Sequence, residues 1–137
     1  MRYKANNLLI DNLKVENLAK KYSTPIYCYS YSKLEENIKK FQKDFRKINP
    51  TICFAVKSNP NIILLKEIGK LGLGADVVSI GELMKSLKSG IKPNKIVFSG
   101  VGKTSNEIEY AIKKRILLIN AESKSEILEI ERIAKKN

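Results

Sequence analysis

The sequence predicts an α/β protein, most of which is part of a (β/α)8 barrel of the TIM type. Short apolar segments at residues 51–56, 75–79, 95–99 and 116–120 alternate with amphipathic segments. Parallel neighbouring strands need helical crossovers, so this alternation predicts a parallel sheet. Four consecutive units of near-equal length fit the first half of such a barrel. A doubly wound open sheet is the alternative, because it shows the same alternation.

Apolar residues three or four positions apart mark a helix after each of these strands. The helical positions are Ile62, Leu65 and Ile68; Leu83, Met84 and Leu87; Ile108 and Ile112; and Ile127, Ile130 and Ile133. Gly69, Gly72 and Gly74 follow a helix rather than a strand, so they do not fit a dinucleotide-binding loop. They are expected to end that helix and to open the next strand.

The pattern is different in the first third of the chain. Residues 8–10 and 24–30 predict strands, with a short amphipathic helix between them. Ser32 is a candidate N-cap for a longer helix. The first turn of that helix would hold Glu35 and Glu36, and its apolar face would carry Leu34, Ile38, Phe41 and Phe45.

The net charge of +12 raises the question of a nucleic-acid partner. Of the 26 basic residues, 22 are lysine and only 4 are arginine, the residue that base reading favours. The lysines are spread over nearly every polar face, as expected for a solvated surface. We therefore expect no nucleic-acid partner.

Other chemistries and locations are limited by what the chain contains. It has no histidine, and its carboxylates are scattered, so metal catalysis and Ser-His chemistry lack their residues here. Cys28 and Cys53 lie in apolar segments without paired spacing and are expected to be small buried side chains. No apolar run is long enough for a membrane helix, and no secretory signal opens the chain, so a cytoplasmic protein is expected.

Barrel enzymes carry their chemistry at the carboxyl ends of the strands. The polar residues expected there are Lys57, Ser58 and Asn59; Asp76 and Ser79; Ser99 and Lys103; and Asn120 and Glu122. Lys57 ends a nearly continuous apolar strand. An enclosed, partly apolar setting would disfavour its ammonium form and leave a free amine able to attack an aldehyde. In so lysine-rich a chain, a solvent-exposed strand terminator is the alternative for Lys57.

The segment FAVKSNP at residues 54–60 resembles the cofactor-lysine motif of the ornithine, diaminopimelate and arginine decarboxylase family, which has an alanine-racemase-like barrel. Three further segments match that family in order: LGLGADVVSIGEL at 71–83, IVFSGVGKT at 96–104 and NAES at 120–123. TPIYCY at 24–29 is similar to the segment by which the family enters its barrel. The resemblance spans roughly residues 8–135, and the diaminopimelate branch fits best.

The resemblance implies that Lys57 binds pyridoxal 5'-phosphate as a Schiff base and that the Asp76 carboxylate lies beside the cofactor. It implies a carbon-carbon lyase that decarboxylates a small amino acid, best matched by meso-diaminopimelate, in lysine biosynthesis. A homodimer is expected at full length. Residues 1–30 would contribute to a second, β domain, and residues 31–137 would form the amino-terminal part of the barrel. Ser79 and Glu82 are expected to cap a helix rather than to act in catalysis.

Four units cannot close a barrel, so the chain is expected to be an amino-terminal fragment that is inactive alone. The phosphate loop, the ring-nitrogen partner and the substrate-binding residues would then lie beyond Asn137. The main alternative is a non-catalytic pyridoxal-phosphate-binding homeostasis protein on the same barrel. Residues 24–29 argue against it, because such proteins lack this entering strand.

Overall fold

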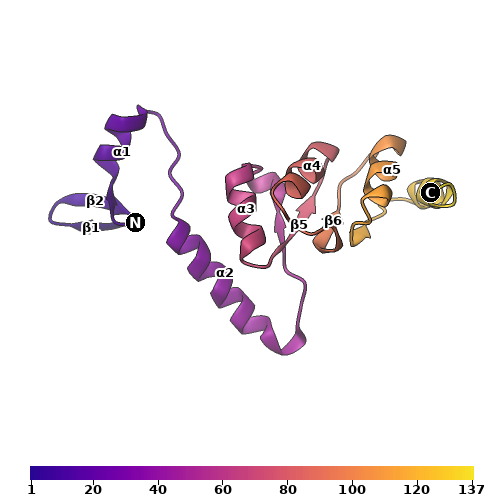
Figure 1. Cartoon of the computed structure of the whole chain (residues 1–137), viewed down its shortest axis with the longest axis horizontal. Helices are drawn as coiled ribbons and strands as arrows, with labels where there is room; N and C mark the ends of the chain where they lie inside the picture. Colours follow the sequence, from indigo (N-terminus) through magenta and orange to yellow (C-terminus); the bar gives the residue numbers. More distant parts are fainter. The chain divides into compact units, whose positions relative to one another are not determined.

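The computed structural model describes all 137 residues, and the chain forms two compact units, Met1–Ile48 and Asn49–Asn137. Figure 1 shows the sheet and helices of the first unit in indigo and purple and the alternating strands and helices of the second in magenta to yellow. No helix is both long enough and apolar enough to cross a membrane. The division of the chain at residues 30 and 31, expected from the resemblance, stays a prediction.

The amino-terminal unit contains an antiparallel sheet and two helices. Strands β1 (Arg2–Lys4), β2 (Asn7–Ile10) and β3 (Leu13–Lys14) lie in that order, and helices α1 (Val15–Tyr22) and α2 (Tyr31–Phe45) follow. The two hairpin turns, Ala5 with Asn6 and Asp11 with Asn12, have positive φ angles at both positions. Two-residue turns of this kind match the twist of paired strands, and Asn and Asp tolerate the conformation.

Three expectations for this unit are wrong. Residues 24–30 are not a strand, because no other strand of the chain pairs with them, and Cys28 is exposed rather than buried. The N-cap of α2 is Ser30 rather than Ser32: Ser30 Oγ accepts a hydrogen bond from Lys33 N at 3.1 Å. The Ser32 hydroxyl is engaged elsewhere, because it donates to Asp11 Oδ1 at 2.5 Å.

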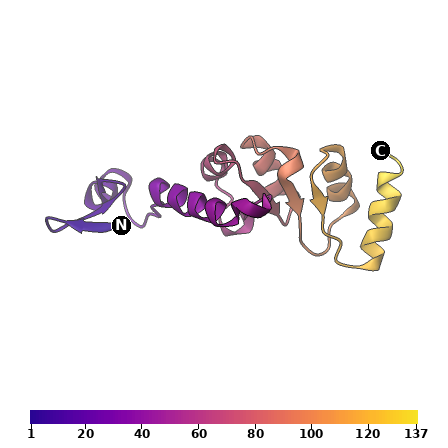
Figure 2. The same ribbon diagram turned by 90° about the horizontal axis from the view of Figure 1, so that it is seen from below.

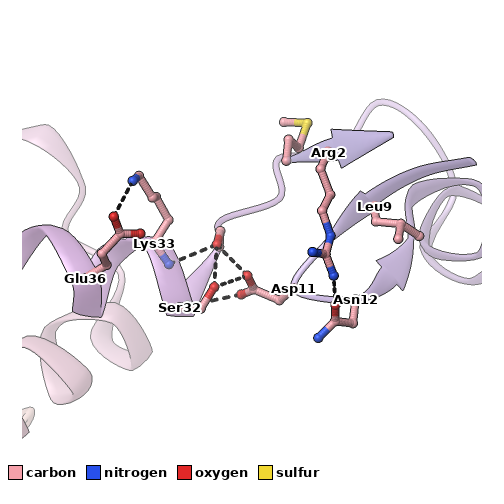
Figure 3. Close-up of a pocket in the computed structure, with 9 residues that line it drawn as sticks. Arg2, Leu9, Asp11, Asn12, Ser32, Lys33 and Glu36 are labelled. Atoms are coloured by element: carbon pink, nitrogen blue, oxygen red, sulfur yellow. Dashed lines mark hydrogen bonds and ion pairs between the residues drawn. The ribbon is translucent and has the colours of Figure 1, made fainter. Parts of the chain in front are cut away.

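Asp11 connects the β2–β3 turn to the start of α2 (Figure 3). Its carboxylate accepts hydrogen bonds from the hydroxyls of Ser30 and Ser32, both at 2.5 Å, and from Ser32 N at 3.3 Å. These donors stabilise the charged form and lower the pKa of Asp11 from 3.8 to about 2, with the Ser30 hydroxyl as the largest cause. One ionised side chain therefore joins two segments of the unit, the β2–β3 turn and the start of α2.

We expect acid to release this connection. Because the folded-state pKa is depressed, the Asp11 contribution to stability is fully present above pH 3.8 and is lost as the pH falls through about 2. The variant Asp11→Asn should be less stable than the parent protein near neutral pH, and the two should converge near pH 2. Denaturant unfolding followed between pH 2 and 7 measures this difference. Asp44→Asn on exposed α2 is the control, and a parallel pH dependence in both variants would contradict the prediction.

The carboxyl-terminal unit is a parallel sheet with helices on one face (Figure 2). Its strands are β4 (Cys53–Ala55), β5 (Gly74–Val77), β6 (Ile96–Phe98) and β7 (Leu118–Ile119), paired in that order. Its helices are α3 (Ile62–Lys70), α4 (Ile80–Lys88), α5 (Ser105–Lys113) and α6 (Lys124–Ala134), and the 3-10 turns η2 (Val56–Ser58) and η3 (Pro93–Lys95) complete the unit. All four predicted strands and helices are confirmed, with strands shorter than expected.

The strand order separates the two predicted sheet types. Each strand pairs with the next one in sequence, without the reversal that marks a doubly wound sheet. Successive helices also contact one another, α3 with α4, α4 with α5 and α5 with α6. Helices of a single winding lie on one face of the sheet, so the arrangement is that of part of a (β/α)8 barrel.

Local sequence sets the boundaries of these helices. Asn61, Ser79, Thr104 and Ser123 each accept a backbone hydrogen bond as N-cap residues. Ser79 caps α4 as expected. Glu82, however, accepts from Val78 N at 2.9 Å rather than from the N-cap itself. Gly72, with a φ of 86°, follows the end of α3, in agreement with its predicted role.

The core between sheet and helices contains one unsatisfied polar group. Its fully buried members include Val56, Leu65, Ala75, Val77, Leu83, Ile96, Phe98 and Ala111. Ser86 on α4 is also fully buried, and its hydroxyl has no hydrogen-bond partner. A buried hydroxyl without a partner retains the cost of losing water.

Ser86→Ala should therefore raise the free energy of unfolding, by about 1 kcal/mol, since it removes an unsatisfied hydroxyl and adds a better helix former. Ser89→Ala provides the matched comparison. The Ser89 hydroxyl is buried too, but it donates to the Ser86 carbonyl at 2.7 Å, so its loss should lower stability by about 1 kcal/mol. Urea denaturation midpoints measure both changes, and equal losses in the two variants would show that Ser86 has a partner after all.

Candidate cofactor site at the strand ends

One face of the parallel sheet is free of helices and carries the candidate site. Ala55, Asp76, Val97 and Leu118 are register partners across the four strands. Their neighbours along the strands, such as Val77 and Phe98, belong to the core beneath the helices. Side chains alternate between the two faces of a strand, so this row lies on the helix-free face. In a (β/α)8 barrel that face lines the interior.

Lys57 lies at the carboxyl end of β4, as predicted, in the 3-10 turn η2. The turn is fixed by the Ser58 hydroxyl, which donates to the Ala55 carbonyl at 2.7 Å, and by the buried neighbour Val56. The Lys57 side chain is exposed, and it forms no hydrogen bond or ion pair within the chain. These residues alone do not supply the apolar enclosure expected for it, and they leave its amine accessible to a ligand.

Asp76 lies in β5, the strand next to β4, and directly opposite Ala55. The Ser99 hydroxyl donates to Asp76 Oδ1 at 2.7 Å. Asn120 Nδ2 in turn donates to Ser99 Oγ at 2.9 Å. Three polar side chains that follow or belong to adjacent strands are thus connected by hydrogen bonds. We call Asp76, Ser99 and Asn120 the strand-end relay.

A buried ion pair lies behind this relay. The Lys103 side chain is 1% exposed, and its ammonium group donates to Glu126 Oε1 at 2.9 Å, to the Gly100 carbonyl at 2.6 Å and to the Asn120 carbonyl at 2.7 Å. Glu126 also accepts a hydrogen bond from Glu122 N, which is the largest cause of its lowered pKa. Both charges are compensated, as burial requires.

Sequence reasoning found some of these residues and missed one. Ser99, Lys103 and Asn120 were expected at the strand ends, although without partners. Glu126 was not singled out. Its signal was its spacing from Ser123, since a serine followed three residues later by glutamate marks a helix start.

The donor set fits a cofactor that carries an aldehyde. Lys57 offers a primary amine with no partner in the chain, as covalent attachment to an aldehyde carbon requires. Asp76 offers a carboxylate one strand away, which suits the positive charge on a nitrogen joined to that carbon. Pyridoxal phosphate has this chemistry. The fold is that of part of a (β/α)8 barrel, and the residues at its strand ends fit a cofactor of this chemistry.

Comparisons with known proteins agree with this class. Residues 31–137 match the model of the pyridoxal-dependent decarboxylase family, pyridoxal binding domain. The chain is 47% identical over 119 residues to a diaminopimelate decarboxylase of Helicobacter pylori, covering 87% of this chain and 29% of that protein. It is 40% identical over 136 residues to the enzyme of Aquifex aeolicus, covering 99% of this chain and 32% of that protein.

Solved structures show the same likeness. The diaminopimelate decarboxylase of M. jannaschii in co-complex with L-lysine superposes with a TM-score of 0.95 at 33% identity, covering 98% of this chain and 32% of that chain. The Helicobacter pylori enzyme complexed with L-lysine gives a TM-score of 0.86 at 43% identity, covering 90% and 31%. This chain therefore belongs to the pyridoxal-dependent decarboxylase family. It spans about a third of the length of these relatives.

Proposed function

We propose that the protein containing this chain decarboxylates meso-diaminopimelate to L-lysine and CO2 with pyridoxal 5'-phosphate. The observation that carries the proposal is the position of Lys57, which follows β4 at its carboxyl end, next to the strand that holds Asp76, within the residues that match the family model. Two similar solved enzymes were obtained with L-lysine, the expected product.

In this reaction one carbon-carbon bond breaks and one carbon-hydrogen bond forms, with no net oxidation. When bound, pyridoxal phosphate supplies an electron sink for the electron pair left as CO2 departs. Lys57 would hold the cofactor covalently through Nζ. Its amine is also the group of this chain that can carry a proton to and from the reacting centre. Asp76 would face the positive charge at the point of attachment.

The substrate is tested with the complete gene product loaded with pyridoxal phosphate. We expect CO2 and L-lysine from meso-diaminopimelate and no CO2 from ornithine or arginine. Release of CO2 from one of the other two would move the protein to another branch of the family. Cofactor binding without CO2 from any of the three would instead identify a non-catalytic pyridoxal-phosphate protein.

The proposal extends to a homodimer and to a cytoplasmic location. The resemblance supports the first, and a role in amino-acid biosynthesis supports the second. Sedimentation equilibrium of the complete gene product is expected to give twice the subunit mass, and a single-subunit mass would remove the dimer from the proposal.

A further inference from the structure

We propose that Ser99 and Asn120 are positioning residues that orient Asp76 toward the nitrogen joining Lys57 to its cofactor, and that the buried Lys103 ammonium holds both in place. The inference rests on the proposed function and adds to it three residues outside the attachment chemistry.

The hydrogen bonds of the strand-end relay run in one direction, from Asn120 through Ser99 to Asp76. Asn120 Nδ2 is a donor only, so Ser99 Oγ must be the acceptor of that 2.9 Å bond. A hydroxyl has a single proton, which Ser99 therefore directs to Asp76 Oδ1 at 2.7 Å. Oδ1 is thereby fixed as an acceptor. The other oxygen, Oδ2, has no hydrogen bond in the chain and is left for a positively charged partner.

The sheet fixes the backbone nitrogen of Ser99 and that of Asn120. Ser99 N donates to the Val77 carbonyl at 2.8 Å, and Asn120 N donates to the Phe98 carbonyl at 2.9 Å. These bonds continue the ladders of β5, β6 and β7 by one residue. They hold the backbone nitrogens of Ser99 and Asn120 in place. The peptide groups that follow, at the start of the loops, have no strand partners.

Lys103 fixes the peptide groups that follow Ser99 and Asn120. Its three N–H donors go to the Asn120 carbonyl, to the carbonyl of Gly100, which follows Ser99, and to Glu126. A buried ammonium is costly unless every donor is used, and all three are used here. The same group also lies 5.7 Å from the centre of the Phe98 ring. One side chain therefore ties together the two loops that carry Ser99 and Asn120.

The test compares the isosteric variant Asn120→Asp with Ser99→Ala in the holoenzyme. The readout is the ratio of the visible to the near-ultraviolet cofactor band at fixed pH, which reports the proton on the attachment nitrogen. Ser99→Ala should lower this ratio by about tenfold, the effect of one charge-assisted hydrogen bond. Asn120→Asp should lower it too, because the new carboxylate would accept the Ser99 proton and leave Asp76 Oδ1 without its donor.

Ser105→Ala is the matched control. The Ser105 hydroxyl also donates to a carboxylate, Glu129 Oε1, at 2.6 Å, but this bond takes no part in the strand-end relay. Its loss should leave the band ratio unchanged. Unchanged ratios in Ser99→Ala and Asn120→Asp would overturn the role of the relay. If the parent protein showed no visible band at all, the proposed function itself would fail instead.

Lys103 is tested by the double variant Lys103→Met with Glu126→Gln, because Lys103→Met alone would leave a buried charge unpaired and endanger folding. The amide introduced by Glu126→Gln can still accept from Glu122 N, so we expect a folded protein that binds the cofactor with a lowered band ratio. Adding Ser99→Ala should then lower the band ratio little further, since both changes disable the same relay. Lys113→Met, a surface lysine of α5, is the control. A folded double variant with the parent ratio would reduce Lys103 to a structural role.

Discussion

Replacement of Lys57 by alanine is expected to remove the visible cofactor band. The decarboxylation rate should fall by about 100-fold to 10,000-fold, the range for loss of one positioned acid-base group. The Lys57 side chain is exposed and its amine has no hydrogen-bond or ion-pair partner in the chain, so its loss should cost the fold little. The unfolding midpoint without cofactor should therefore stay at the parent value. Absorbance titration with pyridoxal phosphate, CO2 release and denaturant unfolding measure the three quantities.

Two companion variants separate the causes. Lys57→Arg keeps the positive charge but offers no amine that can bond to an aldehyde, so it should also lose the band. Lys66→Ala removes an exposed lysine of α3 and should change nothing. A visible band that survived in Lys57→Ala would assign the cofactor to another lysine. A band that survived only in Lys57→Arg would show that charge, rather than covalent attachment, holds the cofactor.

The predicted features that the structure confirms are those that depend on local periodicity. Alternating apolar strands and amphipathic helices are decided within about 20 residues, and Lys57 is located by its place at the end of one strand. The hairpin turn at Ala5 and Asn6 was missed, since it lacks the glycine that usually marks such turns. The expected strand at 24–30 failed because pairing depends on a second segment.

The contacts around the site depend on the register of the strands, which the apolar periodicity of the sequence does not determine. Ser99 and Asn120 are 21 residues apart, and Lys103 and Glu126 are 23 apart, so each pair meets only once the strands are aligned. The N-cap of α2 was misplaced for the same reason: Asp11 engages Ser32 from 21 residues away. A strand-end polar residue can thus be predicted from sequence, whereas its partner requires the fold.

Gly74→Ala is expected to lower the free energy of unfolding by about 3 kcal/mol or more, at the upper end of overpacking effects. Gly74 opens β5 between β4 and β6, and a Cβ there would lie 2.0 Å from the Lys95 carbonyl oxygen and 2.9 Å from Cys53 Sγ. The first of these is backbone, which cannot turn away as a flexible side chain can. Accommodation would have to move β6 relative to β5, and with it the Ser99 hydroxyl that reaches Asp76.

The control for this variant is expected to change the free energy of unfolding in the opposite direction. Gly81 lies in the first turn of α4, and a Cβ there would meet only Ser79 Oγ, at 3.9 Å. Gly81→Ala should therefore stabilise the protein by about 0.5 to 1 kcal/mol, because alanine is the better helix former. Urea midpoints measure both. Equal stability of Gly74→Ala and the parent protein would contradict the close approach of the Lys95 carbonyl to Gly74.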